Sequence, residues 1–173
     1  MPESSPDRVK PDQASPDRVK PDRVKPDRTK LGRTVLELDR FLPYRLSVLS
    51  NRISGEIAAL YETRLEISVT EWRVMAVLGR YPQVSAVEVA EHTAMDKVAV
   101  SRAVNALIER GLLLRDIHSD DRRRSVLALS DAGFAIYDQI VPLALDYERQ
   151  LLESLSQAEI KRFDAQLDAL LQR

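Results

Sequence analysis

Polar and small side chains suited to contacting a nucleic acid gather on one segment, residues 97–110. Apolar residues recur there at helical spacing, which predicts one buried helix face and leaves the other side chains on the remaining faces. On those faces an arginine can pair with guanine, an asparagine can pair with adenine, and small residues allow close approach to a groove floor. The candidate DNA contacts are Lys97, Ala99, Ser101, Arg102 and Asn105.

A β-hairpin with a charged tip is predicted directly after this helix. Two short apolar strands, 112–117 and 125–129, flank the polar residues 118–124. One aspartate of the tip can pair with an arginine and hold the loop in shape, which leaves another arginine free to enter a minor groove. The stabilising pair is assigned to Asp121 and Arg123, and the minor-groove contact to Arg122 or Arg124.

The elements around these residues follow the order of a winged helix-turn-helix, in which a helix enters the major groove and a hairpin contacts DNA beside it. Ser85 and Glu88 form a capping box for a short helix that ends near His92, and a tight turn follows. Asp96 is a suitable N-cap for the segment 97–110, and Gly111 suits its C-terminal end. The polar face of an isolated amphipathic helix is ordinarily just exposed to solvent, and the same is true of a charged loop. The flanking elements favour DNA binding here.

Composition excludes several classes of function. The 173 residues carry a net charge of −1 and no cysteine, which rules out disulfides, thiol catalysis and thiolate metal sites. The two histidines lack companions with metal-ligand spacing, and no phosphate-binding glycine loop or catalytic triad is visible. We therefore expect no enzyme activity, no cofactor and no metal. The charge of the predicted DNA-binding segment differs from the net charge of the chain, since residues 95–124 carry 7 basic and 5 acidic side chains.

The N-terminal segment, residues 1–33, contains a five-residue repeat, Pro-Asp-Arg-Val-Lys, with a proline at every fifth position from Pro6 to Pro26. Regular prolines prevent a helix, and one valine in each repeat cannot build a core, so the segment is expected to be disordered. It is either a solvated linker or an auxiliary arm whose basic residues touch DNA phosphate.

Helices are predicted on both sides of the helix-turn-helix (67–130), within one domain spanning 34–173. The first, 34–66, starts at a Thr34/Glu37 capping box, and Pro43 must kink it or start a new helix. A further helix opens at Thr70 and stops before Pro82. The C-terminal part, 131–173, contains a helix with a proline kink at Pro142 and a last helix capped by Ser156 and Glu159. The N- and C-terminal helices carry more apolar surface than so small a centre can cover, which favours a homodimer.

The chain resembles the MarR (multiple-antibiotic-resistance regulator) family of bacterial transcription factors from about Leu42 to its C-terminus. The residues that carry the resemblance are Leu42-Pro-Tyr-Arg-Leu-Ser, Thr70-Glu-Trp-Arg-Val-Met, Val89-Ala-Glu, Val100-Ser-Arg-Ala-Val-Asn-Ala-Leu-Ile-Glu-Arg-Gly-Leu and Asp121-Arg-Arg-Arg-Ser-Val-Leu-Ala-Leu-Ser-Asp-Ala-Gly133. The last of these is similar to the family's wing signature. The N-terminal repeat has no counterpart in the family pattern.

The resemblance implies a mostly α-helical fold with a small hairpin wing, in which the N- and C-terminal helices form a dimer. It also implies a repressor that binds pseudo-palindromic double-stranded DNA and leaves it when a small ligand binds. Ser101 and Arg102 match recognition-helix contacts, and Asp121 and Arg123 match the wing-stabilising pair.

A ligand pocket is expected between the dimerisation helices and the helix-turn-helix. Arginine beside aromatic side chains suits an aromatic acid or its thioester, such as an aryl-CoA. Core packing or surface ion pairs would explain the same residues without a ligand. The candidates are Tyr44, Arg45, Arg52, Trp72, Arg73 and Met75.

Two other interpretations remain open. One is an architectural protein that binds DNA without sequence preference, and the other is a sensor or interaction module that has lost DNA binding. No secretory signal or membrane-length apolar run is visible, so we expect a cytoplasmic, nucleoid-associated protein with no membrane partner.

Overall fold

The computed structural model describes residues 35–117 and 125–172. The chain divides into two units, residues 1–41 and 42–173. The described part of the first unit contains a short 3₁₀ helix, η1 (Leu38–Arg40), next to an Arg40–Glu37 salt bridge of 3.3 Å. The proline repeat lies outside the described residues, so its predicted disorder stays a prediction.

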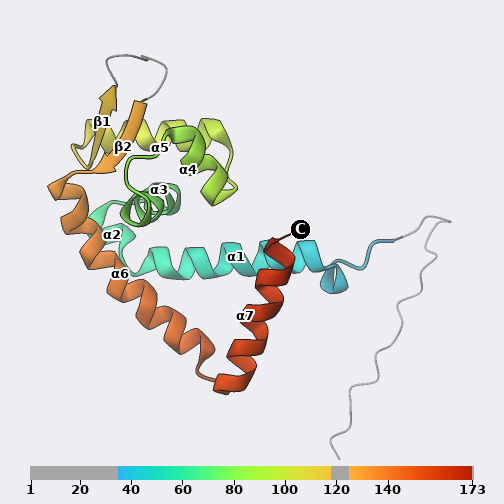
Figure 1. Ribbon diagram of the computed structural model, residues 1–173. Helices are drawn as coiled ribbons and strands as arrows, with labels where there is room; N and C mark the ends of the chain where they lie inside the picture. The colour runs from blue at the N-terminus through green and yellow to red at the C-terminus, as the bar shows by residue number, and fades with distance from the viewer. Residues whose placement is uncertain (1–34, 118–124, 173) are drawn as a thin grey trace, which may run out of the picture. The chain divides into compact units, whose positions relative to one another are not determined.

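The second unit is mostly helical, with one two-stranded antiparallel hairpin (Figure 1), and this confirms the predicted fold class. Its elements are α1 (Leu42–Ala59), α2 (Glu62–Leu65), α3 (Val69–Arg80), α4 (Ala86–Thr93), α5 (Lys97–Glu109), β1 (Leu113–Ile117), β2 (Ser125–Leu129), α6 (Asp131–Leu152) and α7 (Gln157–Leu171).

The core lies where α3, α4 and α5 pack together under the hairpin. In the hairpin, Leu113 pairs with Leu129 and Ile117 with Ser125, and an isolated bridge joins Val84 to Leu127. The residues below 1% exposure are all apolar, so burial of aliphatic surface dominates the stability of this unit. They are Ile67, Val74, Met75, Val89, Val100, Val104, Leu107 and Ile140.

Helix starts follow the predicted capping residues except at α1 and α3. The described residues before Leu42 contain no α-helix, so the start predicted from the Thr34/Glu37 capping box is wrong and the alternative of a new helix near Pro43 is observed. Ser85 and Ser156 each complete a capping box with the glutamate three residues later, as predicted for α4 and α7. For α3 the predicted start at Thr70 is wrong, because Ser68 is the cap. The Glu71 carboxylate accepts a 2.8 Å hydrogen bond from the Ser68 backbone N–H, and the Ser68 hydroxyl accepts one from the Glu71 N–H.

The first predicted helix is two helices in the structure. α1 begins at Leu42, which places Pro43 in its first turn, where the missing N–H breaks no helical hydrogen bond. It ends at Ala59, and α2 begins at Glu62. The break turns the Tyr61 ring into the core, where the residue is 1% exposed. Burial of this ring depends on tertiary packing, so the helical spacing of the sequence does not predict it.

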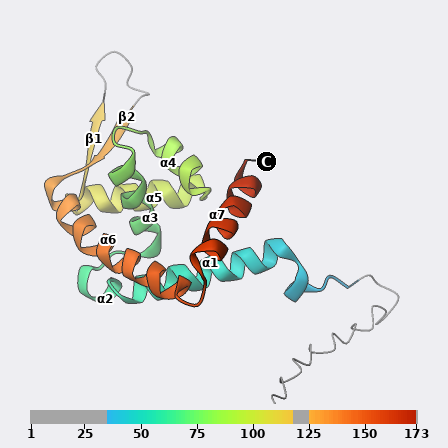
Figure 2. The same cartoon turned by 60° about the horizontal axis from the view of Figure 1, so that its bottom comes forward.

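α6 leads from the hairpin to α7, and the two helices meet at a sharp corner (Figures 1 and 2). α6 continues as one helix through Pro142, and the kink predicted there stays a prediction. In the described residues no helix is long and apolar enough to cross a membrane. The same residues contain no group of three or more His, Cys, Asp or Glu side chains that could hold a metal ion.

Gly133 allows the first turn of α6 to lie against the start of the hairpin, because a Cβ there would collide with the backbone carbonyl of Leu112. We expect Gly133→Ala to lower the free energy of unfolding by about 1–3 kcal/mol, measured by urea denaturation. Gly55→Ala is the matched control. It lies in α1 with no atom within 4 Å of its added Cβ, so it should raise stability by up to about 1 kcal/mol. Equal effects of the two changes would contradict the assigned contact.

Candidate nucleic-acid interface

α5 begins at a tight turn from α4. Ala94 adopts a left-handed backbone conformation (φ 51°), and its N–H donates to carbonyls at the end of α4. Asp96 then caps α5, since its Oδ1 accepts from the N–H groups of Val98 and Ala99 at 2.9 and 3.0 Å. These bonds satisfy donors that a helix start otherwise leaves unpaired, and they fix where α5 begins.

One face of α5 is buried and the opposite face is open. Val100, Ala103, Val104 and Leu107 are buried, and Ile108 is half-buried, so the predicted apolar face is confirmed. Of the candidate DNA contacts Ala99 is half-buried, and the exposed ones are Lys97, Ser101, Arg102 and Asn105. Their spacing of four, one and three residues brings these four exposed side chains onto one face of the helix.

A groove of about 380 Å³ lies between α5 and the start of α3. Arg102 lines it together with the hydroxyl-bearing Ser68 and Thr70, and Glu71 contributes the one carboxylate of the lining. The guanidinium of Arg102 and the Thr70 hydroxyl can donate to phosphate or base edges, whereas the Ser68 hydroxyl already donates to Glu71 Oε2 at 2.7 Å.

The C-terminal end of α5 is tied to the corner between α2 and α3 by Arg110. Its guanidinium donates to the carbonyl oxygens of Glu66 at 2.8 Å and Leu65 at 3.2 Å. It also lies 3.5 Å from the carboxylate of Glu71, the residue that completes the cap of α3. Three contacts to one planar group fix the direction of α5 relative to α3.

The base of the hairpin is pinned to the same end of α5. The Ser130 hydroxyl donates to the carbonyl of Gly111 at 2.7 Å and accepts from the Gly133 N–H at 3.0 Å. Gly111 has a φ of +69°, which confirms the predicted helix end. The wing residues Asp121, Arg122, Arg123 and Arg124 lie outside the described residues.

Two arginines with structural contacts at α5 were not predicted from the sequence. Arg110 stands at the end of α5 and binds carbonyls of Leu65 and Glu66, and Arg115 contacts a side chain of α5. The sequence pattern places Arg110 only at the end of the helix and gives it no partner. Arg115, on β1, donates to Oδ1 of Asn105 at 3.3 Å. Both contacts join residues from different elements, and the only available signal was the position of an arginine close to the predicted recognition helix.

The candidate ligand residues fall into two groups. Trp72 and Arg73 are half-buried on α3, and Arg73 donates to the Ser54 hydroxyl of α1 at 2.8 Å. In the described part of the chain no hydrogen bond or ring contact joins these two to the exposed α1 residues. The exposed α1 residues are Tyr44, Arg45 and Arg52, and Met75 is fully buried in the core.

Tyr61 lies beside Trp72, although the sequence did not predict it as a ligand-binding residue. The two rings lie 6.1 Å apart, and Trp72 lies 5.7 Å from the ring of Tyr137 on α6. The hydroxyl of Tyr61 is buried, and it makes no hydrogen bond within the described structure. Burial raises the pKa of Tyr61 to about 12. An unpaired buried hydroxyl is costly, so a polar partner at this point would be stabilising.

Comparisons with known proteins agree with this geometry. The MarR family model matches residues 65–124, from the end of α2 to the hairpin tip. A crystal structure of a MarR/EmrR family transcriptional regulator from Acinetobacter sp. ADP1 is 28% identical, with a TM-score of 0.72, and the match covers 79% of this chain and 96% of that one.

Residues 65–124 match the MarR family of transcriptional regulators, and the chain is similar to members of that family in sequence and in fold.

Other proteins that the chain matches are regulators too. A putative transcriptional regulatory protein for the hcr operon of Thauera aromatica is 28% identical over 111 residues, 61% of this chain and 67% of that protein. The chain spans about two thirds of the length of the curated relatives it matches. CouR from Rhodococcus jostii RHA1, solved with p-coumaroyl-CoA, is 18% identical with a TM-score of 0.66, covering 79% of this chain and 95% of CouR, and shares the fold. Since the relatives are transcriptional regulators, the prediction that the chain is not an enzyme is confirmed.

Replacing Arg110 tests whether it holds α5 in position. We expect Arg110→Gln to weaken binding to a specific duplex several-fold while leaving the salt dependence unchanged, because Arg110 contacts protein carbonyls rather than phosphate. Fluorescence anisotropy at several salt concentrations measures both quantities. Arg80→Gln, an exposed arginine at the end of α3, is the control. A salt slope that falls by about one would instead make Arg110 a phosphate contact.

Proposed function

We propose that this protein is a sequence-specific, double-stranded DNA-binding regulator whose α5 reads the major groove. The observation that carries the proposal is the donor-rich open face of α5, formed by Lys97, Ser101, Arg102 and Asn105. This face is presented by a helix whose two ends are held by Asp96 and Arg110. A rigidly held helix with polar side chains outward can form base contacts without first becoming ordered.

The functional form is a homodimer. Large apolar side chains are exposed on α1 and α7, and nothing in the described chain covers them. Leu46, Leu49, Phe163 and Leu170 are between 40% and 45% exposed. A second copy of the chain would remove this surface from water, and twofold symmetry would pair two α5 helices with the halves of a palindromic site.

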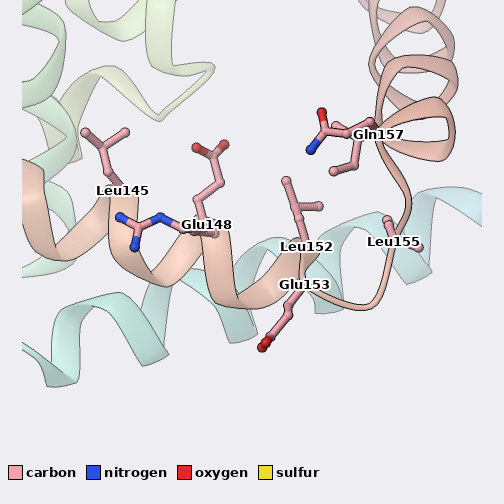
Figure 3. A pocket seen from close by; sticks show the side chains of 8 residues that line it. Leu145, Glu148, Leu152, Glu153, Leu155 and Gln157 are labelled. Carbon is pink, nitrogen blue, oxygen red and sulfur yellow. The ribbon is translucent and has the colours of Figure 1, made fainter.

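The corner between α6 and α7 extends this apolar surface. A groove of about 500 Å³ there is lined by leucines and Ile160 together with Glu148, Arg149, Glu153 and Gln157. Leu145 and Glu148 point to one side of α6, and Glu153 points to the other (Figure 3). Exposed leucines next to charged side chains suit a surface that another protein chain covers.

The hairpin tip supplies the second contact with DNA. Asp121 and Arg123 hold the tip, and Arg122 or Arg124 enters the minor groove beside the site read by α5. This assignment is supported by the spacing of these residues after β1 and by the bonds that pin the hairpin base to α5. Negative potential in a narrow minor groove favours an arginine there.

A small aromatic acid or its thioester is the effector, and its binding releases a repressor from DNA. The Tyr61 hydroxyl supports this, because it lacks a partner beside Trp72 and near the Arg73 side chain. A hydroxyl and a guanidinium can bind a carboxylate or a thioester carbonyl, and the aromatic rings can pack on an aryl group. That CouR binds p-coumaroyl-CoA on the same fold supports this ligand class.

Selection of binding sites from a random duplex library tests the proposed function. With full-length protein at about 0.15 M salt, we expect enrichment of a palindrome whose half-sites lie about one helical turn apart. Arg102→Ala should then cost about 1–3 kcal/mol on the enriched duplex and relax the preference at one position in each half-site. Binding without enrichment would indicate an architectural protein, and absence of binding would indicate a sensor or interaction module.

Sedimentation velocity tests the dimer. At micromolar concentration we expect a dimer, and Leu170→Glu should shift it toward monomer because a charge would be buried in the interface. Leu114→Glu is the control, since Leu114 is 59% exposed on β1, away from α1 and α7 in the chain. A wild-type monomer at this concentration would refute the proposal.

Tyr61→Phe separates effector response from folding. Removing an unpaired buried hydroxyl should raise the free energy of unfolding by about 1 kcal/mol and leave DNA affinity unchanged. Because folding raises the tyrosine pKa from its ordinary value of 10.0 to about 12, wild-type stability should fall above pH 10, and this loss should be smaller in the variant. Release from DNA by aromatic acids or p-coumaroyl-CoA should need more ligand. An unchanged response to every effective ligand, in Tyr61→Phe and in Arg73→Ala, would contradict this site.

A further inference from the structure

The contact between Arg115 and Asn105 links the wing to the face of α5 that is open to solvent. The Nη2 atom of Arg115 on β1 donates to the Oδ1 atom of Asn105 at 3.3 Å, and both side chains are exposed. The two residues are ten positions apart in the chain. Their contact therefore depends on how β1 returns alongside α5.

The register of the hairpin directs Arg115 toward α5. Arg115 pairs with Leu127 across the sheet, and Leu113 lies two residues earlier on β1, so all three share one face of the hairpin. Leu113 and Leu127 are buried in the core that includes α5. Arg115 continues this face beyond the edge of the core, where its guanidinium reaches Asn105.

Donor chemistry fixes the orientation of the asparagine amide. An arginine side chain has only donors, so the atom it contacts must be the amide oxygen, and the NH₂ group must point elsewhere. Among the described residues no hydrogen bond engages that NH₂ group. Asn105 therefore offers its NH₂ donors to a ligand, while a cation occupies one of the two acceptor positions of its oxygen.

This orientation changes the base that Asn105 can read. Bidentate pairing with adenine needs the amide oxygen to accept from the adenine amino group and the NH₂ to donate to N7. With Arg115 on that oxygen, one of its two lone pairs is occupied and a positive charge lies beside the other, which disfavours the approach of the adenine amino group. Guanine presents two acceptors, N7 and O6, in the major groove, and so it matches the donors of this pair.

We propose that Arg115 is a positioning residue that holds Asn105 as a donor and thereby sets a guanine preference at one position of each half-site. The proposal rests on the proposed function, because it assumes that the open face of α5 reads bases. It replaces the adenine pairing that an isolated Asn105 would favour.

The test compares binding-site selections for the full-length protein and three variants. Asn105→Ala identifies the position read by Asn105, which loses its preference. At that position the wild-type protein should favour guanine over adenine by about fivefold or more in relative affinity. Arg115→Met, which keeps the length of the side chain but has no donor, should shift the preference to adenine and leave the other positions unchanged.

Arg115→Lys is the rescue variant, because an ammonium group also only donates, and it should retain guanine. A structural role or a phosphate contact of Arg115 would lower affinity uniformly across sequences and would not move the base preference. Three results would overturn the inference: adenine preferred by the wild type at this position, a preference unchanged in Arg115→Met, or no position relaxed by Asn105→Ala. Failure of the proposed function looks different, since the wild-type protein would then enrich no sequence at all.

Discussion

The structure depends on burial of one face of α5. Val100, Val104 and Leu107 have no exposed surface, and they pack against α3, α4 and the hairpin. Each fully buried aliphatic side chain of this kind stabilises the fold by about 1.5–3 kcal/mol. This burial holds the opposite face outward, and polar bonds at the two ends, from Asp96 and Arg110, limit how the helix can turn or slide.

The small size of this core also explains why the outer helices keep apolar side chains exposed. The core around α5 is small, and α1, α6 and α7 extend beyond it with leucines that it does not cover. α6 is nevertheless tied back to the first helices, since Tyr147 on α6 donates to Glu56 on α1 at 2.5 Å, and Arg64 on α2 donates to Gln139 at 3.1 Å. Arg64 lies on α2, and α2 ends at the carbonyls that Arg110 binds, so this short helix joins α6 to the C-terminal end of α5.

Local features of the sequence predicted much of the fold, and tertiary contacts account for the rest. The caps Ser85, Asp96 and Ser156 act within three residues, so pattern alone located the helices they begin. The break before α2 and the hydroxyl of Tyr61 depend on packing between elements. Arg110 donates hydrogen bonds to carbonyl oxygens of residues 44 and 45 positions away in the sequence. A single sequence gives no sign of such a partner, and the same holds for the contact that engages Asn105.

Hydroxyl-radical footprinting on an enriched duplex tests the central claim that two α5 helices read adjacent turns of one DNA face. The account predicts two protected backbone segments, related by a dyad and centred about one helical turn apart. These should vanish when the sequence is scrambled at constant length and salt. A single protected segment, or protection that persists on the scrambled duplex, would contradict it.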